Sequence, residues 1–494
     1  MGDFKLSKSR ILAGIQCHKR IYLTCHSPDK ADPISPGVQF RFDEGTRVGS
    51  LARELFSGGL LINVEHDAVI DVTKKALEDP KINYIYEAAF VYESIVVRVD
   101  VLSRCEENTW DIIEVKSSTK PQNEHVQDLA IQKIVLCGNS LKIKRTKLLY
   151  LNNKYIFNGL KIDMGELFVT ADLTNEVAGV EEEILGRIAD IRKVLSAPST
   201  PEIKIGKQCD KPHKCNFHKH CHSGLEKNHV TTLPRVTTSL LNRLYDQNIE
   251  SITKIPDDFY ALSKSQKIVR DCVAENKTYI DRQELKKLEN LTTPICFLDF
   301  ETINPAIPIY KNTAPYERIP FQWSLHIFDG PSDPLHKEFL ADSHADPRIG
   351  FLDSLLSDLP TSGSIVVYSS AEKTVLNHLK LTYPEMGIQL ESVVDRLFDL
   401  LPILTKGYYH PLFGGSSSLK RVLPALIPEL SYDRLEIGGG MDASAMFMKM
   451  ALNDLDPLDF RPIREKLLQY CKLDTRALFL VYKVLVDELR ISKR

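Results

Sequence analysis

The sequence has no long apolar segment and no strong excess of either charge. No run of about 18 apolar residues occurs among the 494 residues, so a membrane-spanning helix and a membrane partner are not expected. The first residues lack the apolar core of a signal peptide, which favours a cytoplasmic protein. The 63 basic and 66 acidic side chains give a net charge of −3, which neither indicates nor excludes a nucleic-acid partner. No internal repeat or low-complexity segment is present.

The composition is that of a soluble globular protein, with 43% hydrophobic and 26% charged residues. A chain of this length exceeds what a single core usually holds. Strand-like and helical patterns are mixed along it, which predicts an α/β fold. We expect one domain over residues 1–224, a helical connector over 225–290 and a second domain over 291–494. The connector is either a helix-hairpin-helix element or a plain helical linker.

Two strand-like runs in the first domain carry acidic residues, at 94–102 and 110–116. They predict an antiparallel pair. Glu114 and Lys116 are two residues apart on the second strand, so they project from the same face, and Asp100 on the neighbouring strand can meet them. Carboxylates that converge with a lysine at a sheet edge indicate a site for Mg²⁺ or Mn²⁺. The alternative is a solvated surface pair.

These residues resemble the motif of PD-(D/E)xK nucleases, with Asp100 and Glu114-Val115-Lys116 in the motif positions. RecB-like members of that group carry a glutamine on the following helix, which corresponds to Gln132 here. The resemblance implies that Asp100 and Glu114 bind the metal ion and that Lys116 orients the attacking water. Glu87 is either an additional acid of this site or a solvated strand residue.

Four of the ten cysteines form a second pattern. Cys209, Cys215 and Cys221 are separated by five residues each, and Cys17 precedes them on a helix predicted over 8–23 with Ser7 as its N-cap. One cysteine before the nuclease core and three after it resemble RecB-like nucleases with a [4Fe–4S] cluster, of the CRISPR-associated Cas-four and AddB type. The resemblance implies a structural cluster. Zinc is the alternative, held by these thiolates or by three of them and a nearby histidine.

The second domain begins with a buried strand, PICFLDFET, that carries Asp299 and Glu301 on one side. Two acids on a buried strand are costly without a metal ion or partner. The pair resembles the D-x-E motif of DnaQ-like (DEDD) exonucleases. Glu372 opens a helix after a later strand, where that superfamily usually has aspartate, and is expected to be a further metal ligand.

Tyr470 and Asp474 complete this second constellation on the last long helix. They are four residues apart, so they lie on one face of that helix. They resemble the Y-x3-D motif, which implies that Asp474 is a metal ligand and that Tyr470 orients the attacking water. The region also resembles an uncharacterised DnaQ-like, RNase H-like domain that follows RecB-like nucleases in bacteria. Residues expected near a substrate, with packing or capping as the alternative, are Tyr316, Phe321, Gln322, His410, Ser418 and Lys420.

Together the two resemblances imply a metal-dependent nuclease with a RecB-like centre and a DnaQ-like 3′→5′ exonuclease centre. Its expected substrate is DNA, single-stranded or with free ends. The alternatives are an RNA-processing nuclease and a nucleic-acid-binding protein in which one centre is inactive. Because Glu372 stands where aspartate is usual, the second centre is the one more expected to be inactive.

Overall fold

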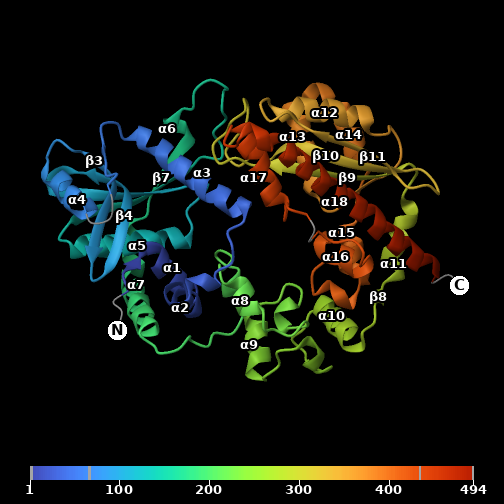
Figure 1. Ribbon diagram of the computed structural model, residues 1–494, viewed down its shortest axis with the longest axis horizontal. Coiled ribbons are helices and arrows are strands. Elements are labelled where there is room, and N and C mark those ends of the chain that lie inside the picture. The colour runs from blue at the N-terminus through green and yellow to red at the C-terminus, as the bar shows by residue number, and fades with distance from the viewer. Residues whose placement is uncertain (1–3, 65–67, 433–434, 492–494) are drawn as a thin grey trace. The chain divides into compact units, whose positions relative to one another are not determined.

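The computed structural model describes residues 4–64, 68–432 and 435–491. The chain forms two compact units, described separately below. The N-terminal unit comprises residues 1–34, 39–224 and 305–317. The C-terminal unit comprises residues 35–38, 225–304 and 318–494. Both combine helices with a mixed sheet, which confirms the α/β class (Figure 1). Every helix in the described ranges is too short or too polar to cross a lipid bilayer.

The N-terminal unit is built on a seven-stranded sheet in the order β2-β3-β4-β5-β6-β7, with β1 parallel to β4. Its strands are β1 Leu6–Ser7, β2 Leu60–Leu61, β3 Tyr84–Tyr92, β4 Ile95–Arg104, β5 Thr109–Lys116, β6 Lys142–Leu151 and β7 Phe168–Asp172. Its helices are α1 Lys8–Gln16, α2 His18–His26, α3 Pro36–Ala52, α4 Ala68–Glu78, α5 Asn123–Gly138, α6 Met164–Leu167, α7 Thr174–Leu195 and α8 His218–His222. The β4–β5 pair is antiparallel, as the sequence predicts.

Each face of this sheet has its own apolar core. Residues of α1, α5 and α7 pack on one face, and Val48 and Ala52 of α3 pack on the other. The pleat of β5 sends Ile112 to the first core and Ile113 to the second. The next two alternate positions, Glu114 and Lys116, therefore face α5.

The helix predicted over residues 8–23 is two helices. Ser7 caps the first, as expected, because its hydroxyl accepts a hydrogen bond from the backbone N–H of Arg10 at 3.3 Å. The helix ends at Gln16, and Cys17 adopts an extended conformation with φ −163° and ψ 124° before α2 begins. The apolar pattern continues through this residue, so periodicity alone does not reveal the break.

The C-terminal unit contains a five-stranded sheet in the order β11-β10-β9-β12-β13. Its strands are β9 Ile295–Ile303, β10 Ile319–Phe328, β11 Leu335–Leu340, β12 Ile365–Val367 and β13 Leu397–Asp399, with β8 Tyr279–Ile280 and β14 Tyr408–Tyr409 as a separate pair. Its helices are α9 Thr238–Asp246, α10 Lys264–Glu275, α11 Arg282–Leu285, α12 Pro347–Asp358, α13 Ala371–Thr382, α14 Gly387–Asp395, α15 Leu401–Lys406, α16 Leu419–Leu426, α17 Gly440–Ala451 and α18 Pro457–Ile491. β9 is antiparallel to β10 and parallel to β12.

Helices cover both faces of this sheet (Figure 1). Leu298 and Phe300 of β9 pack with α12, α13 and α14. On the opposite face the Phe297 ring contacts Phe479 of α18, with ring centroids 5.5 Å apart. Because side chains alternate along a strand, Asp299 and Glu301 share the face of Phe297 and point toward α18.

Two connecting segments each belong to one of the units. Residues 225–290 cluster with the C-terminal unit, and within them α9 and α10 are separated by residues 247–263. Residues 305–317, which join β9 to β10, belong to the N-terminal unit instead. Short 3-10 helices complete the fold at Pro28–Lys30, Arg53–Leu55, Glu106–Asn108, Lys207–Cys209, Val230–Thr232, Ile252–Lys254, Lys286–Asn290, Pro384–Met386 and Pro411–Phe413.

Candidate functional site

Three of the predicted residues of the N-terminal unit meet between β5 and α5. Lys116 Nζ lies 2.6 Å from Glu114 Oε1 and 2.7 Å from Asp128 Oδ2. Gln132 donates from Nε2 to Glu114 Oε2 at 2.7 Å and to Asp128 Oδ1 at 3.1 Å. Gln132, Asp128 and Glu114 are buried, so this network is shielded from solvent. The residues that the resemblance identified on β5 and α5 are thus brought together.

Lys8 at the start of α1 is a fifth member of this network, which sequence reasoning missed. Its Nζ lies 2.8 Å from Glu114 Oε1 and 3.1 Å from Asp128 Oδ1. Burial alone would raise the pKa of Glu114, but Lys116 and Lys8 hold it well below its ordinary value. No local pattern relates Lys8 to a strand 106 residues away. Asp128 was detectable, since it lies one helical turn before Gln132.

Asp100 on β4 is the remaining predicted acid. Its Oδ2 accepts a hydrogen bond from the backbone N–H of Val115 at 2.7 Å. Burial and the nearby Glu114 carboxylate raise the pKa of Asp100 to about 7. Asp100, Glu87, Glu114, Lys116 and Lys8 line one cleft of about 620 Å³. Glu87 has a positive φ of 57°, which is unusual for a strand residue.

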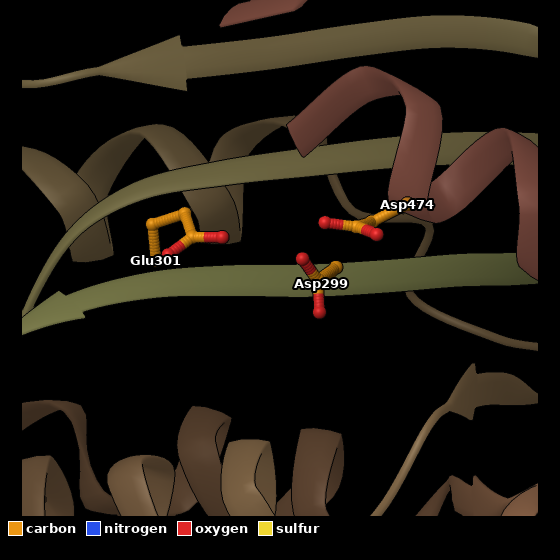
Figure 2. Close-up of side chains that lie close together, drawn as sticks. All are labelled: Asp299, Glu301 and Asp474. Carbon is orange, nitrogen blue, oxygen red and sulfur yellow. The ribbon is translucent and has the colours of Figure 1, made fainter. Parts of the chain in front are cut away.

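The second predicted constellation comes together on the α18 face of β9 (Figure 2). Asp299, Glu301 and Asp474 each offer a carboxylate oxygen, and these oxygens lie within 4.8 Å of one another. Within the described ranges, this is the one group of three or more His, Cys, Asp or Glu ligand atoms so close together. The two strand acids share a face because they are two residues apart, and α18 lays Asp474 over them.

The three carboxylates repel one another. Burial, followed by Asp474, raises the pKa of Asp299 well above its usual range and that of Glu301 to about 8. Burial also raises the pKa of Asp474 to about 6. Like charges held this close in a poorly hydrated place favour the protonated forms unless a cation neutralises them. Oxygen ligands of this kind are those that Mg²⁺ and Mn²⁺ prefer.

Two tyrosines and a lysine surround this group. Tyr470, one turn before Asp474, is buried and 4% exposed. Tyr432, which sequence reasoning missed, donates from its hydroxyl to Asp474 Oδ1 at 2.6 Å. Lys420 Nζ lies 5.3 Å from the centroid of the Tyr470 ring and 5.6 Å from that of Tyr432. Lys420 therefore lies beside the acids, where the sequence places a phosphate-contacting residue.

Glu372 lies in the first turn of α13, as predicted, but outside the group of three acids. It is buried, and its charge contributes to the raised pKa of Asp299. Its Oε2 atom is buried without a hydrogen-bond partner in the described part of the chain. Burial is also the largest cause that raises the pKa of Glu372 to about 7.

Several further residues expected near a substrate have packing or capping roles. Phe321 stacks on Phe447 with ring centroids 4.1 Å apart, and Gln322 donates to the Leu467 carbonyl at 2.8 Å. Tyr316 belongs to the N-terminal unit, where its hydroxyl donates to the Ser117 carbonyl. His410 and Ser418 occupy N-cap positions, of the Pro411–Phe413 turn and of α16. These contacts favour the packing and capping alternative for Phe321, Gln322, His410 and Ser418, and a role near a substrate stays a prediction.

The four predicted cysteines line one small pocket of the N-terminal unit. Cys17 enters it from the break between α1 and α2, and Cys209, Cys215 and Cys221 enter from the segment that ends in α8. The backbone N–H of Cys215 donates to the Cys209 carbonyl at 2.8 Å, and that of Phe217 lies 3.4 Å from Cys215 Sγ. Burial raises the pKa of Cys209, Cys215 and Cys221.

The raised acids of the C-terminal unit predict a pH-dependent stability. In the unfolded chain these carboxyl groups lose their protons near pH 4, whereas in the folded chain Asp474, Glu372 and Glu301 retain them to about 6, 7 and 8. The folded state then holds more protons, so stability falls as pH rises from about 5 to 8. In EDTA we expect the melting temperature to decrease across this window, as scanning calorimetry can measure. Added Mg²⁺ should reverse the decrease.

The variant Glu301→Gln provides the control for this prediction. It removes a carboxyl group whose pKa is raised to about 8 and keeps the size of the side chain. The melting curve of the variant should depend less on pH above 7 than that of the unmodified chain. An equal dependence would show that the acids of this group do not set the slope.

The comparisons with known proteins assign no function. A family described as a domain of unknown function (DUF2779) matches residues 296–418. The "Uncharacterized protein MG366 homolog" of Mycoplasma pneumoniae is 28% identical over 211 residues, and MG366 of Mycoplasma genitalium is 28% identical over 212 residues. The uncharacterized protein UU173 of Ureaplasma parvum is 26% identical over 223 residues. Each match covers 39% or 40% of this chain and 32% of the relative, about a third of its length.

Proposed function

We propose that the protein is a metal-dependent nuclease that hydrolyses DNA phosphodiesters at two centres, one in each unit. The observation that carries the proposal is the group of Asp299, Glu301 and Asp474, in which one buried and two half-buried carboxylates have oxygens within 4.8 Å of one another. Such a group has a high electrostatic cost, which a divalent cation would offset. We therefore assign Mg²⁺ or Mn²⁺ to it, with Glu372 and its unpartnered Oε2 as an additional candidate ligand.

A cation held there would supply Lewis-acid stabilisation of a phosphate and of an attacking hydroxide. The protein's own groups have separate roles. The Tyr470 hydroxyl orients the water, and Lys420 offsets the charge of the substrate phosphate. The water oxygen adds to phosphorus and the P–O3′ bond breaks. The reaction gives a nucleoside 5′-monophosphate, a new 3′-hydroxyl end and one released proton. This matches the 3′→5′ exonuclease activity that the DnaQ-like resemblance implies.

The N-terminal centre rests on a different arrangement. Asp100, Glu87 and Glu114 supply carboxylates on the wall of an open cleft, while Lys116 bridges Glu114 and Asp128. Two lysines now neutralise Glu114, at 2.6 Å and 2.8 Å. A divalent cation would compete with them for the same oxygen and would free a lysine to face a phosphate or orient a water molecule. We propose this as the RecB-like centre.

We propose a [4Fe–4S] cluster on Cys17, Cys209, Cys215 and Cys221, with zinc as the alternative. Four thiols line one pocket, and four thiolates are the usual ligand set of such a cluster.

The proposal is tested with end-labelled substrates. Single- and double-stranded DNA and RNA are incubated with the full chain and Mg²⁺ or Mn²⁺, and products are separated by length. We expect degradation of single-stranded DNA from its ends. Preferential loss of RNA would assign the substrate to RNA instead. A protein that binds these strands and cleaves none of them is a binding protein, and the proposed function is then wrong.

Lys116→Ala separates the two centres. Loss of this lysine should reduce cleavage by the N-terminal centre by about 10²-fold or more, because it removes a preorganised charge at the scissile phosphate. Release of 3′-terminal mononucleotides by the C-terminal centre should persist. Lys133→Ala is the matched control, since Lys133 lies on α5 and pairs with Glu181 at 2.5 Å, away from the cleft. If Lys116→Ala and Asp299→Ala both leave cleavage unchanged, the site assignments are wrong.

A further inference from the structure

Part of the wall of the N-terminal cleft is formed by residues of α3. Arg41, Gly45 and Gly49 of α3 line the cleft at intervals of four residues, and Arg53, the first residue of the 3-10 helix that follows α3, continues this stripe. An arginine stands at each end of the stripe, and their Cα atoms are about 18 Å apart at 1.5 Å per residue. None of the catalytic residues predicted from the sequence lies on this helix.

Between the arginines, the helix surface is open. A Cβ atom built on Gly45 or on Gly49 would meet no atom within 4 Å. Glycine inside a helix costs about 1 kcal/mol relative to alanine, so Gly45 and Gly49 destabilise α3. Close packing does not require glycine at either position. The two glycines leave a trough along the helix that a ligand can approach to backbone distance.

Beside this trough lies an exposed aromatic ring. Phe42 lines the same cleft and is 57% exposed, whereas most phenylalanines of the chain are buried. Thr46 and Ser50 follow it at intervals of four residues and place hydroxyl groups along the same edge. Arg53 donates to Ser50 Oγ at 2.8 Å, and a guanidinium has five donors, so most of its donors are not used by this bond.

The two walls of the cleft carry different charges. Arg41 and Arg53 line the α3 wall, and the carboxylates Glu87, Asp100 and Glu114 line the other wall together with Lys8 and Lys116, which pair with Glu114. Phosphate and stacked bases suit the first wall, and a cation suits the second. A volume of about 620 Å³ is that of a pocket for a small molecule, which corresponds to one or two nucleotides.

We propose that this face of α3 binds a single polynucleotide strand, with its phosphates on Arg41 and Arg53, a base stacked on Phe42, and its backbone in the trough over Gly45 and Gly49. The inference rests on the proposed nuclease function and deepens it, because it names the substrate of the N-terminal centre as unpaired strand. DNA and RNA share this chemistry, and the test below separates them.

The test fills the trough. Gly49→Leu places a side chain in the cleft where the fold leaves room, so the variant should fold and should lose strand binding. The matched control is Gly186→Leu on α7, where a Cβ also meets no atom within 4 Å but no cleft is present. Both changes favour the helix, so melting temperatures should be equal to or above that of the unmodified chain.

Binding is measured in EDTA, with fluorescence anisotropy of 12-residue oligothymidine and oligouridine, so that cleavage plays no part. We expect Gly49→Leu and Phe42→Ala to weaken binding about tenfold or more. Each of Arg41→Gln and Arg53→Gln should reduce the slope of log K against log salt by about 0.7. Stronger binding of one oligonucleotide identifies the sugar that the cleft accepts.

Photocross-linking locates the strand on the full chain, so that binding elsewhere does not obscure the result. Oligonucleotides with 4-thiothymidine or 4-thiouridine should cross-link to a peptide that contains Phe42, and Gly49→Leu should remove this cross-link while Gly186→Leu keeps it. Cross-links confined to other peptides, or equal behaviour of the two leucine variants, overturn the inference. A chain that cross-links through α3 but cleaves nothing supports the binding site and refutes the proposed nuclease function.

Discussion

Replacing Asp299 by asparagine is expected to reduce the release of 3′-terminal nucleotides by about 10³-fold, because it removes a charged ligand worth several kcal/mol in the transition state. The substitution keeps the shape of the side chain on β9. Burial and the charges of Asp474, Glu372 and Glu301 raise the pKa of Asp299 well above its usual range. The activity is measured with a 3′-labelled single strand in Mg²⁺.

The same substitution should stabilise the protein in EDTA. It removes repulsion among three carboxylates whose oxygens lie within 4.8 Å. A rise in melting temperature together with a loss of activity separates a missing ligand from a damaged fold. Asp487→Asn on α18 is the matched control, because Asp487 is exposed and pairs with Arg490 at 3.7 Å within the last turns of the helix. If Asp299→Asn keeps full activity, Asp299 is no metal ligand.

Replacing Cys215 by alanine is expected to remove bound iron and to lower the melting temperature by on the order of 10 °C. Structural metal groups contribute about 10 kcal/mol or more of binding free energy, which is also folding free energy. Here the group would join the break between α1 and α2 to the segment before α8. Iron and labile sulfide in anaerobically purified protein, with the visible absorption of the cluster, measure the loss.

The exposed Cys137 on α5 provides the control, since Cys137→Ser should retain the metal. One zinc ion per chain with no iron in the unmodified protein would contradict the cluster assignment and leave zinc on the same thiols. Absence of both metals from carefully prepared protein would contradict either reading. In that case the four thiols are ordinary buried cysteines.

The sequence predicted the site residues that lie close to one another along the chain. Asp299 and Glu301 are two apart on a strand, and Tyr470 and Asp474 are four apart on a helix, so each pair shares a face whatever the rest of the fold does. The strand predicted over residues 110–116 is also close to the observed β5, so Glu114 and Lys116 were placed correctly on one strand. The spacing of two residues on a strand or four on a helix is enough to predict that two side chains share a face.

Residues that reach the site across the fold left no such pattern. Lys8 meets Glu114 because α1 packs over β5, and Tyr432 meets Asp474 from a segment 42 residues earlier. Glu372 was placed on the correct turn of α13, yet its distance from the acids depends on how that helix packs on the sheet. The end of α1 at Gln16 was hidden because the extended Cys17 interrupts an otherwise continuous apolar pattern.

The segment 305–317 has a practical consequence for anyone who wishes to express the two halves apart. It lies between β9 and β10 in the sequence, but its hydrogen bonds are made in the N-terminal unit, from Ala306 N to Glu44 Oε2 at 2.9 Å and from Asn312 N to the Phe157 carbonyl at 2.7 Å. Ile307 is buried in the same core. A chain cut after residue 224 would leave the N-terminal fragment without part of its core and the C-terminal fragment with an exposed apolar loop. Each polar group left unpaired would cost about 1–3 kcal/mol. Because such fragments would be destabilised, single substitutions in the intact chain are the better way to assign the two activities.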